Sequence, residues 1–123
     1  MLRVYLISIA LATTLMSTVA YSDGGQTGND LLYQCESADP VERIGCLNYV
    51  LGIADGFDFA DAIHMLANRS IQGITGICFP EGVTAGQDRA VVIRYLRNHP
   101  ADLHLASSAL IRNAYAQAWP CKQ

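Results

Sequence analysis

Apolar residues recur at helical spacing through most of the sequence, and no segment alternates apolar and polar residues for long enough to form a strand. Thr27 and Asp30 make a capping pattern, which predicts a short helix that ends near Cys35. A second helix should begin after Asp39, because aspartate is a favourable N-cap and Pro40 suits the first helical position.

The second predicted helix continues to about Asn68. A straight helix of roughly 28 residues would be about 42 Å long, which exceeds the width expected of a domain of about 100 residues. We therefore expect a kink or break at Gly52 and Gly56. With Gly45 these glycines form a narrow stripe, where the missing side chains would let another helix come close. Two apolar faces are typical of a central helix: one holds Ile44, Leu47, Leu51, Ala54, Ala62 and Met65, and the other holds Cys46, Val50, Ile53, Phe57 and Ala60.

Residues 70–82 are rich in glycine and contain Cys78, so they predict a loop that a disulfide ties down. Thr84 and Gln87 form the next capping pattern and open a third long helix. Residues 98–100 should end that helix and start the last one, whose apolar face holds Leu103, Ala106, Leu110 and Ala114. The predicted fold class is therefore all-α, a small bundle of four to five helices.

The beginning of the sequence is typical of a secretory signal peptide. Residues 4–19 carry no charge and are mostly apolar, and Arg3 precedes them. Small residues favour cleavage after Ala20, with Ser22 as the alternative site. The apolar run of roughly 16 residues is shorter than the ~20 that cross a bilayer. We therefore expect export and no membrane anchor after processing.

These boundaries give a signal peptide at residues 1–20, a flexible lead at 21–29 and a single domain at 30–123. The whole chain has 8 basic and 11 acidic residues and a formal net charge of −3 at pH 7. Without Arg3 the exported part carries a charge of about −4, which disfavours nucleic acid and anionic membrane surfaces as partners.

Four cysteines lie in the exported part, and an even number in a small exported chain predicts two disulfides. Three pairings are possible. We favour Cys35 with Cys46, which flank a short turn, and Cys78 with Cys121, which flank the second half of the chain. These loops would contribute roughly 3 and 4 kcal/mol to stability. No cysteine pair has zinc-ligand spacing, and we expect no metal or other cofactor.

Three carboxylates, Asp55, Asp58 and Asp61, follow one another at helical spacing, with His64 after them. Such a set could bind a metal, but His64 lies roughly 180° from Asp55 around a straight helix, so all four cannot reach one ion. We expect Asp58 and Asp61 to form a solvated edge. Asp55 falls on an apolar face, so we expect it to be buried and hydrogen-bonded.

Enzyme motifs are lacking: the sequence has no Gly-x-Ser-x-Gly, His-Glu-x-x-His or phosphate-binding glycine loop. Two further histidines have no nucleophile nearby in sequence. His99 should cap a helix, and His104 should lie one turn into the next. We therefore do not expect an enzyme.

Several short motifs occur in order between about Asp30 and Cys121: Cys46-x-x-Tyr49-x-x-Gly52-x-x-Asp55, Cys78-Phe79-Pro80, Tyr95-Leu96 leading to His99-Pro100, and Pro120-Cys121. Together they resemble the Rap/Tai family of small periplasmic immunity proteins. Proteins of that family are helical and disulfide-bonded, and they protect bacteria against type VI secretion effectors, several of which are peptidoglycan amidases. The resemblance implies a protein that neutralises such a toxin by stoichiometric binding. It also implies that the matched residues support the fold, namely Tyr49, Gly52, Asp55, Pro80, Pro100 and Pro120.

The resemblance does not mark the toxin-contacting surface. Loops on a rigid scaffold often carry recognition, so we expect the contact at the loop of residues 70–82 and the neighbouring acidic edge. The candidate residues are Asp58, Asp61, Ser70, Gln72 and Glu81. A homodimer is a further partner to consider. The alternative function is a small periplasmic stress protein or chaperone-like binder, which would hold many clients instead of one toxin.

Overall fold

A computed structural model describes residues 25–122, so the predicted signal peptide and both cleavage sites lie outside the described residues. The described chain forms four α-helices and one 3-10 helix: α1 (Gly28–Glu36), α2 (Pro40–Asn68), α3 (Ala85–Asn98), η1 (Pro100–Asp102) and α4 (Ser107–Ala118). Within residues 25–122 there is no strand, only two isolated bridges. The prediction of an all-α fold is confirmed.

The segment before α1 is held in place, although the sequence predicted a flexible lead there. Thr27 and Asp30 form the predicted capping box. Gly28 is buried and donates its backbone N–H to Leu105 O at 3.0 Å, and Ser107 donates to Gln26 O at 2.8 Å. The expectation of a loose lead is therefore wrong for residues 26–29, because they pair with the segment that precedes α4.

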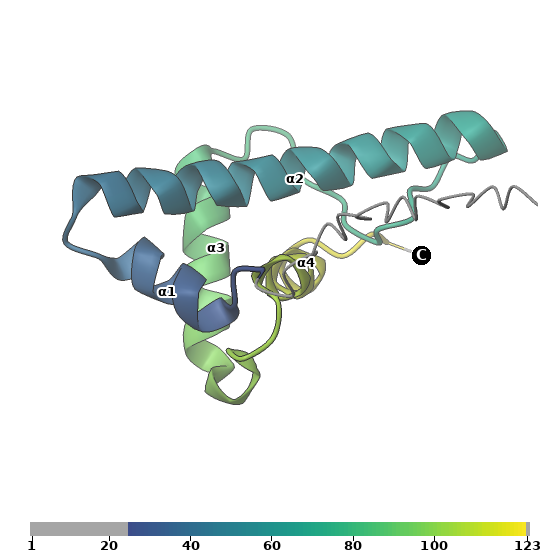
Figure 1. The fold of residues 1–123 in the computed structure, drawn as a ribbon. Coiled ribbons are helices and arrows are strands. Elements are labelled where there is room, and N and C mark those ends of the chain that lie inside the picture. Colours follow the sequence, from purple (N-terminus) through teal and green to yellow (C-terminus); the bar gives the residue numbers. More distant parts are fainter. Residues whose placement is uncertain (1–24, 123) are drawn as a thin grey trace, which may run out of the picture.

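The long helix α2 begins at the predicted Asp39 cap and runs without a break for 29 residues. The expected kink is wrong, because the second half of α2 extends past the other helices instead of crossing the core (Figure 1). The close-approach role of the glycines is also wrong. A Cβ added at Gly52 or Gly56 would have nothing within 4 Å, and one at Gly45 would meet only the end of Gln34 at 3.9 Å.

Only one side of α2 is buried, so it is a peripheral helix and not the central helix that two apolar faces predicted. Cys46, Val50 and Ala54 belong to the core, whereas Ile44 and Met65 are exposed. None of the described helices combines the length and the apolar character that a membrane span requires.

After α2 the chain returns through a loop to α3, which begins with the predicted Thr84 and Gln87 capping box. His99 ends α3, and its Nδ1 lies 2.7 Å from Tyr95 O. The last α-helix begins at Ser107, later than predicted, because η1 and a turn precede it. Leu103, Ala106 and His104 therefore lie before α4, not within it.

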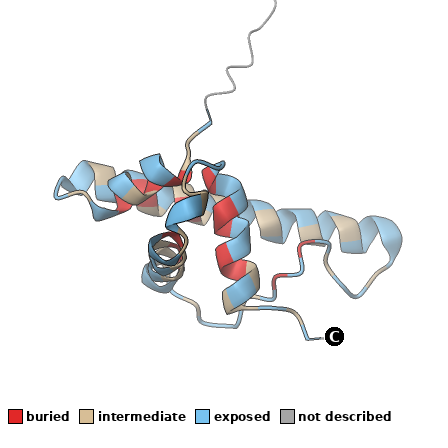
Figure 2. Cartoon of the chain, turned by 90° about the horizontal axis from the view of Figure 1, so that it is seen from below, coloured by how far each residue is buried: buried red, intermediate tan, exposed pale blue. Residues whose placement is uncertain are grey.

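The core forms where the four helices meet, as the buried residues in Figure 2 show. Its centre is Tyr115, whose ring packs edge-on against Phe57 and Phe79 and stacks on Trp119. Both predicted disulfides are confirmed, Cys35–Cys46 and Cys78–Cys121.

Candidate functional site

The far end of α2 and the loop that follows it project from the helix core, and we call residues 58–82 the arm (Figures 1 and 2). Thr75 and Ile77 are its only buried residues. Six of the ten large apolar side chains that are exposed in the described chain lie in this segment: Phe59, Ile63, Met65, Leu66, Ile71 and Ile74. The arm therefore carries most of the large apolar side chains that are exposed among residues 25–122.

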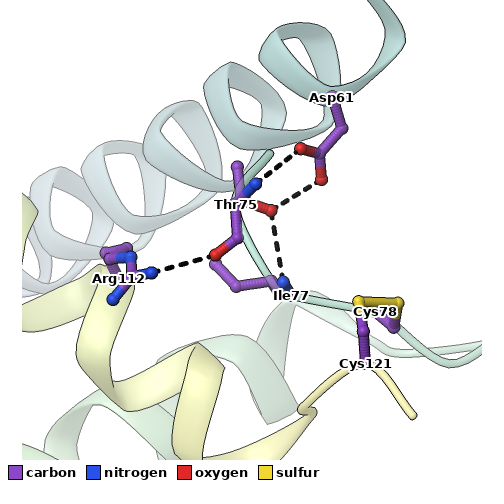
Figure 3. The surroundings of a disulfide bond; sticks show 6 residues. All are labelled: Asp61, Thr75, Ile77, Cys78, Arg112 and Cys121. Carbon is purple, nitrogen blue, oxygen red and sulfur yellow. Dashed lines mark hydrogen bonds between the residues drawn. A yellow bond between two sulfur atoms is a disulfide. The ribbon is translucent and has the colours of Figure 1, made fainter. Parts of the chain in front are cut away.

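The loop of the arm is fastened to α2 by one carboxylate (Figure 3). Thr75 donates its backbone N–H to Asp61 Oδ1 at 2.8 Å and its hydroxyl to Oδ2 at 2.6 Å. The same hydroxyl accepts the N–H of Ile77 at 3.2 Å. Asp61 was expected on a solvated edge, but it is half-buried and both of its oxygens are engaged by the loop. We call this pair the Asp61–Thr75 clamp.

The end of the loop is fastened to the segment after α4. The Cys78–Cys121 disulfide joins the two, Cys78 donates its N–H to Trp119 O at 2.9 Å, and Cys121 donates to Gly76 O at 3.2 Å. Arg112 of α4 donates to Thr75 O at 3.1 Å (Figure 3). The loop of the arm is thus held to α2 on one side and to α4 and the segment after α4 on the other.

An apolar stripe runs along the outer side of the arm. Phe59, Ile63 and Leu66 are spaced four and three residues apart, so they lie on one side of α2. The side chains of Phe59 and Leu66 are 69% and 78% exposed. Asp61 lies about 200° around the helix from Phe59, so the stripe points away from the clamped loop. Nothing in the described chain covers it.

A groove of about 840 Å³ lies on the inner side of the arm, between the end of α2, the loop and the segment that follows α4. Met65, Ile71, Gln72 and Lys122 are among its lining residues. Ile71 is 92% exposed. Apolar surface is therefore available on both sides of the arm.

Of the surface residues that the sequence suggested, Asp58, Gln72 and Glu81 are exposed. Ser70 is half-buried and its hydroxyl bonds locally, donating to Gln72 O and accepting the Gln72 N–H, both at 3.0 Å. These residues all lie on the arm. Asp61 lies there too, but both of its carboxylate oxygens are already bonded to Thr75. His64 takes no part in a cluster, and its Nδ1 lies 3.2 Å from Asn68 Nδ2, one turn further along α2.

The residues suggested as fold supports have unequal surroundings. Tyr49 OH lies 2.8 Å from Ser107 Oγ and so links α2 to the start of α4. Pro100 opens η1. Asp55 is exposed and accepts no hydrogen bond from residues 25–122, so the expectation of a buried, bonded carboxylate is wrong. Two prolines lie beside the second disulfide in sequence: Pro80 and Pro120.

Sequence reasoning missed a buried carboxylate, Asp88, in α3. Only 8% of Asp88 is exposed, and its Oδ1 has no hydrogen-bond partner. Burial raises its pKa, and the charges of Asp58 and Asp55 raise it further. A sequence signal was present, because Asp88 stands four residues before Val92 and eight before Leu96, on the side of α3 that is buried.

Among the described residues, no group of three histidine, cysteine or acidic side chains is arranged to hold a metal ion.

The family model of the Rap1a immunity proteins matches residues 27–121. The chain belongs to the Rap1a immunity protein family. The Rap1a match begins at the N-cap of α1 and ends at Cys121, so it includes all four helices, both disulfides and the whole arm. Neither a curated protein nor a solved structure matches the sequence. The resemblance to immunity proteins that the sequence motifs suggested is confirmed.

Proposed function

We propose that this Rap1a family member acts in the periplasm and neutralises a type VI secretion effector by stoichiometric binding, with no catalysis of its own. The effector class that we propose is a peptidoglycan amidase. Membership of an immunity family supports a toxin as the partner. The predicted signal peptide and two disulfides support an exported protein, since disulfides persist in oxidising compartments.

One observation carries the proposed contact surface, namely the uncovered apolar stripe of Phe59, Ile63 and Leu66 on a rigid arm. Exposed apolar patches of this kind mark interaction sites in soluble proteins. The Asp61–Thr75 clamp and the Cys78–Cys121 disulfide hold the arm before binding, so little ordering entropy is lost when a partner docks. Asp58, the sequence neighbour of Phe59, would extend this surface. A partner that also reaches the loop side of the arm would contact Ser70, Gln72 and Glu81.

The test compares two charge substitutions at equally exposed apolar residues. Leu66→Asp places a carboxylate in the stripe, and Val41→Asp places one in the first turn of α2, where the side chain is 74% exposed. A candidate toxin is sought in the reading frames adjacent to this one and directed to the periplasm, and survival is measured together with calorimetric binding. We expect Leu66→Asp to weaken binding by about 30-fold or more, which corresponds to a hot-spot residue. Val41→Asp should protect like the unmodified protein.

Equal protection by the two variants would remove the arm from the proposed surface. Sedimentation of both variants would then show whether the stripe holds a second copy of the chain. If the protein never neutralises a periplasmic toxin but binds many unfolded proteins, the stress-protein alternative replaces the immunity function.

Compartment is tested separately. Deleting residues 2–20 should abolish protection. The protein would then stay in the cytosol, apart from a periplasmic toxin, where reducing conditions prevent its disulfides from forming. An unrelated signal peptide should restore protection. Equal protection by the cytosolic version would contradict the proposed site of action.

A further inference from the structure

A small acidic pocket lies where α2 faces the end of the arm loop and the first turn of α3. Its volume is about 200 Å³. Three carboxylates line it, Asp55 and Asp58 from α2 and Asp88 from α3. The remaining walls are mainly apolar and are formed by Leu51, Ala54, Phe79, Pro80 and Val83. The pocket therefore combines apolar sides with concentrated negative charge.

No lysine, arginine or histidine among residues 25–122 forms a salt bridge with these three carboxylates. The one salt bridge among residues 25–122 joins Arg97 to Glu36, which are not among the pocket residues. Burial raises the pKa of Asp58, and the neighbouring Asp55 and Asp61 raise it further. Asp88 responds in the same way to burial and to Asp58 and Asp55. Asp55 and Asp58 thus make Asp88 more costly to ionise, and Asp55 has the same effect on Asp58.

Asp88 adds an independent sign that a ligand is missing. It lines the pocket, it is more than nine-tenths buried, and its Oδ1 accepts no hydrogen bond. A buried acceptor without a partner destabilises a protein, so native structures rarely leave one unpaired. A cation at the pocket would supply the missing donor and relieve the repulsion between the three carboxylates.

The walls indicate what kind of cation fits. A bare divalent ion is disfavoured, because no three histidine, cysteine or acidic side chains of the described chain are arranged as metal ligands. Lysine and arginine have apolar stems that pack on apolar surface while the charged head meets a polar group. Their charged donors form strong hydrogen bonds with carboxylates. The pocket also adjoins the arm, since Asp58 is the first residue of the arm and the neighbour of Phe59.

We propose that this pocket receives the side chain of one lysine or arginine from the protein partner, beside the apolar stripe. The inference rests on the proposed function for the identity of that partner as a protein. In the bound state the apolar walls enclose the stem of the side chain, and its ammonium or guanidinium group donates a hydrogen bond to Asp88, while Asp55 and Asp58 supply further negative charge around it.

The experiment uses a small probe, so it does not require the toxin. The ¹⁵N-labelled exported protein is titrated with N-acetyl-arginine amide and, separately, with N-acetyl-citrulline amide, which has a similar shape but no charge. We expect the arginine probe alone to shift the backbone amide signals of Asp55, Phe79 and Asp88. Asp88→Asn should weaken probe binding about 10-fold, as expected for loss of a charge-assisted bond. Glu42→Gln, which removes a carboxylate in the first turn of α2, away from the pocket, should bind like the unmodified protein.

Shifts of equal size with citrulline, or no shift with arginine at millimolar concentration, would overturn the proposal. Equal probe binding by Asp88→Asn and Glu42→Gln would also overturn it. The spectrum of Asp88→Asn shows directly whether the variant is folded. Failure of this titration leaves toxin neutralisation intact as a function, and failure to neutralise a toxin leaves the probe result unchanged.

Discussion

At the scale of single residues, one carboxylate decides whether the arm loop has a fixed shape. Asp61 accepts the hydrogen bonds that the backbone N–H and the hydroxyl of Thr75 donate. Thr75 in turn accepts the N–H of Ile77 at its hydroxyl and a hydrogen bond from Arg112 at its carbonyl oxygen. The loop has few other internal bonds. A change at Asp61 should therefore affect the loop far more than the helix that carries it.

Replacing Asp61 with alanine should leave the backbone N–H of Thr75 without a partner in a buried position, at a cost of about 1–3 kcal/mol. We expect amide hydrogen exchange in residues 71–77 to become much faster, while the core of α3 and α4 stays protected. Asp58→Ala is the matched control, because it removes a carboxylate one turn away that makes no hydrogen bond within the described chain. Similar exchange in both variants would show that the clamp does not hold the loop.

A second residue-scale prediction concerns Asp88. Its pKa in the folded protein is raised above the ordinary value of 3.8. At pH values between the pKa of the unfolded state and the raised pKa of the folded state, the folded protein binds more protons than the unfolded protein. The free energy of unfolding therefore falls as the pH rises through this range. At pH 7 the full cost of the charged, buried group remains. Asp88→Asn should therefore raise the free energy of unfolding at pH 7, on the order of 1 kcal/mol.

The gain from Asp88→Asn should shrink as the pH falls and vanish below about pH 3.8. Urea unfolding at several pH values measures it. A constant difference between the two proteins, or a loss of stability at pH 7, would mean that the carboxylate has a partner in the free protein.

At the scale of elements, the two halves of α2 have different surroundings. Its first half packs on α1 and α3 through Cys46, Val50 and Ala54, and its second half carries the arm. The glycines between the two halves are not required for close packing, since Gly52 and Gly56 have open space around them. They are therefore positions where the helix is weaker than it could be.

Gly52→Ala and Gly56→Ala should each stabilise the protein by roughly 0.5–1 kcal/mol, because alanine loses less backbone entropy than glycine in a helix. The measurement is the free energy of unfolding. Gly28→Ala is the informative contrast, since its Cβ would collide with Leu110 and crowd Leu103 at the start of α1. If Gly52→Ala proved as damaging as Gly28→Ala, the open space around Gly52 would be contradicted.

The sequence was sufficient for features that depend on near neighbours. The caps at Thr27, Asp39 and Thr84 were predicted because each needs only residues within one turn. The pairing Cys35–Cys46 followed from the short turn between its cysteines.

Apart from the Cys78–Cys121 pairing, features that depend on the return of a distant segment were not predicted. Asp61 could be recognised as a clamp only once the loop placed Thr75 beside it, fourteen residues later. Asp55 was misjudged because its exposure depends on how α3 and the loop lie on α2. The spacing of Asp88 to Val92 and Leu96 could have indicated its burial, but the carboxylates that face it come from α2. The unbroken shape of α2 could not be inferred either, since the length argument assumed that the helix stays within the width of the domain.

At the scale of the whole molecule, the two disulfides secure different parts. Cys35–Cys46 joins α1 to α2 across a separation of 11 residues, and Cys78–Cys121 joins the arm loop to the segment after α4 across 43 residues. The longer loop should contribute about 4 kcal/mol and the shorter about 3 kcal/mol. The second disulfide also supports the candidate binding surface.

Replacing Cys78 and Cys121 together with serine should lower the melting temperature and loosen the arm, so that toxin binding is lost even below the new melting temperature. Replacing Cys35 and Cys46 should lower the melting temperature but leave exchange protection at Ile77 intact. Calorimetry and amide exchange on the two double variants distinguish these outcomes. Loss of Ile77 protection in both variants would mean that the arm and the α1–α2 contact unfold as one unit.

The pairing of consecutive cysteines also has a consequence for biogenesis. A chain that enters an oxidising compartment N-terminus first presents Cys46 soon after Cys35, and Cys78 then has no free neighbour until Cys121 arrives. Oxidation in order of arrival therefore yields the native pairs without reshuffling through mixed disulfides. Cells that lack a disulfide isomerase but keep their oxidase should make as much active protein as normal cells, and protection against an incoming toxin should be ready as soon as each chain has crossed the membrane.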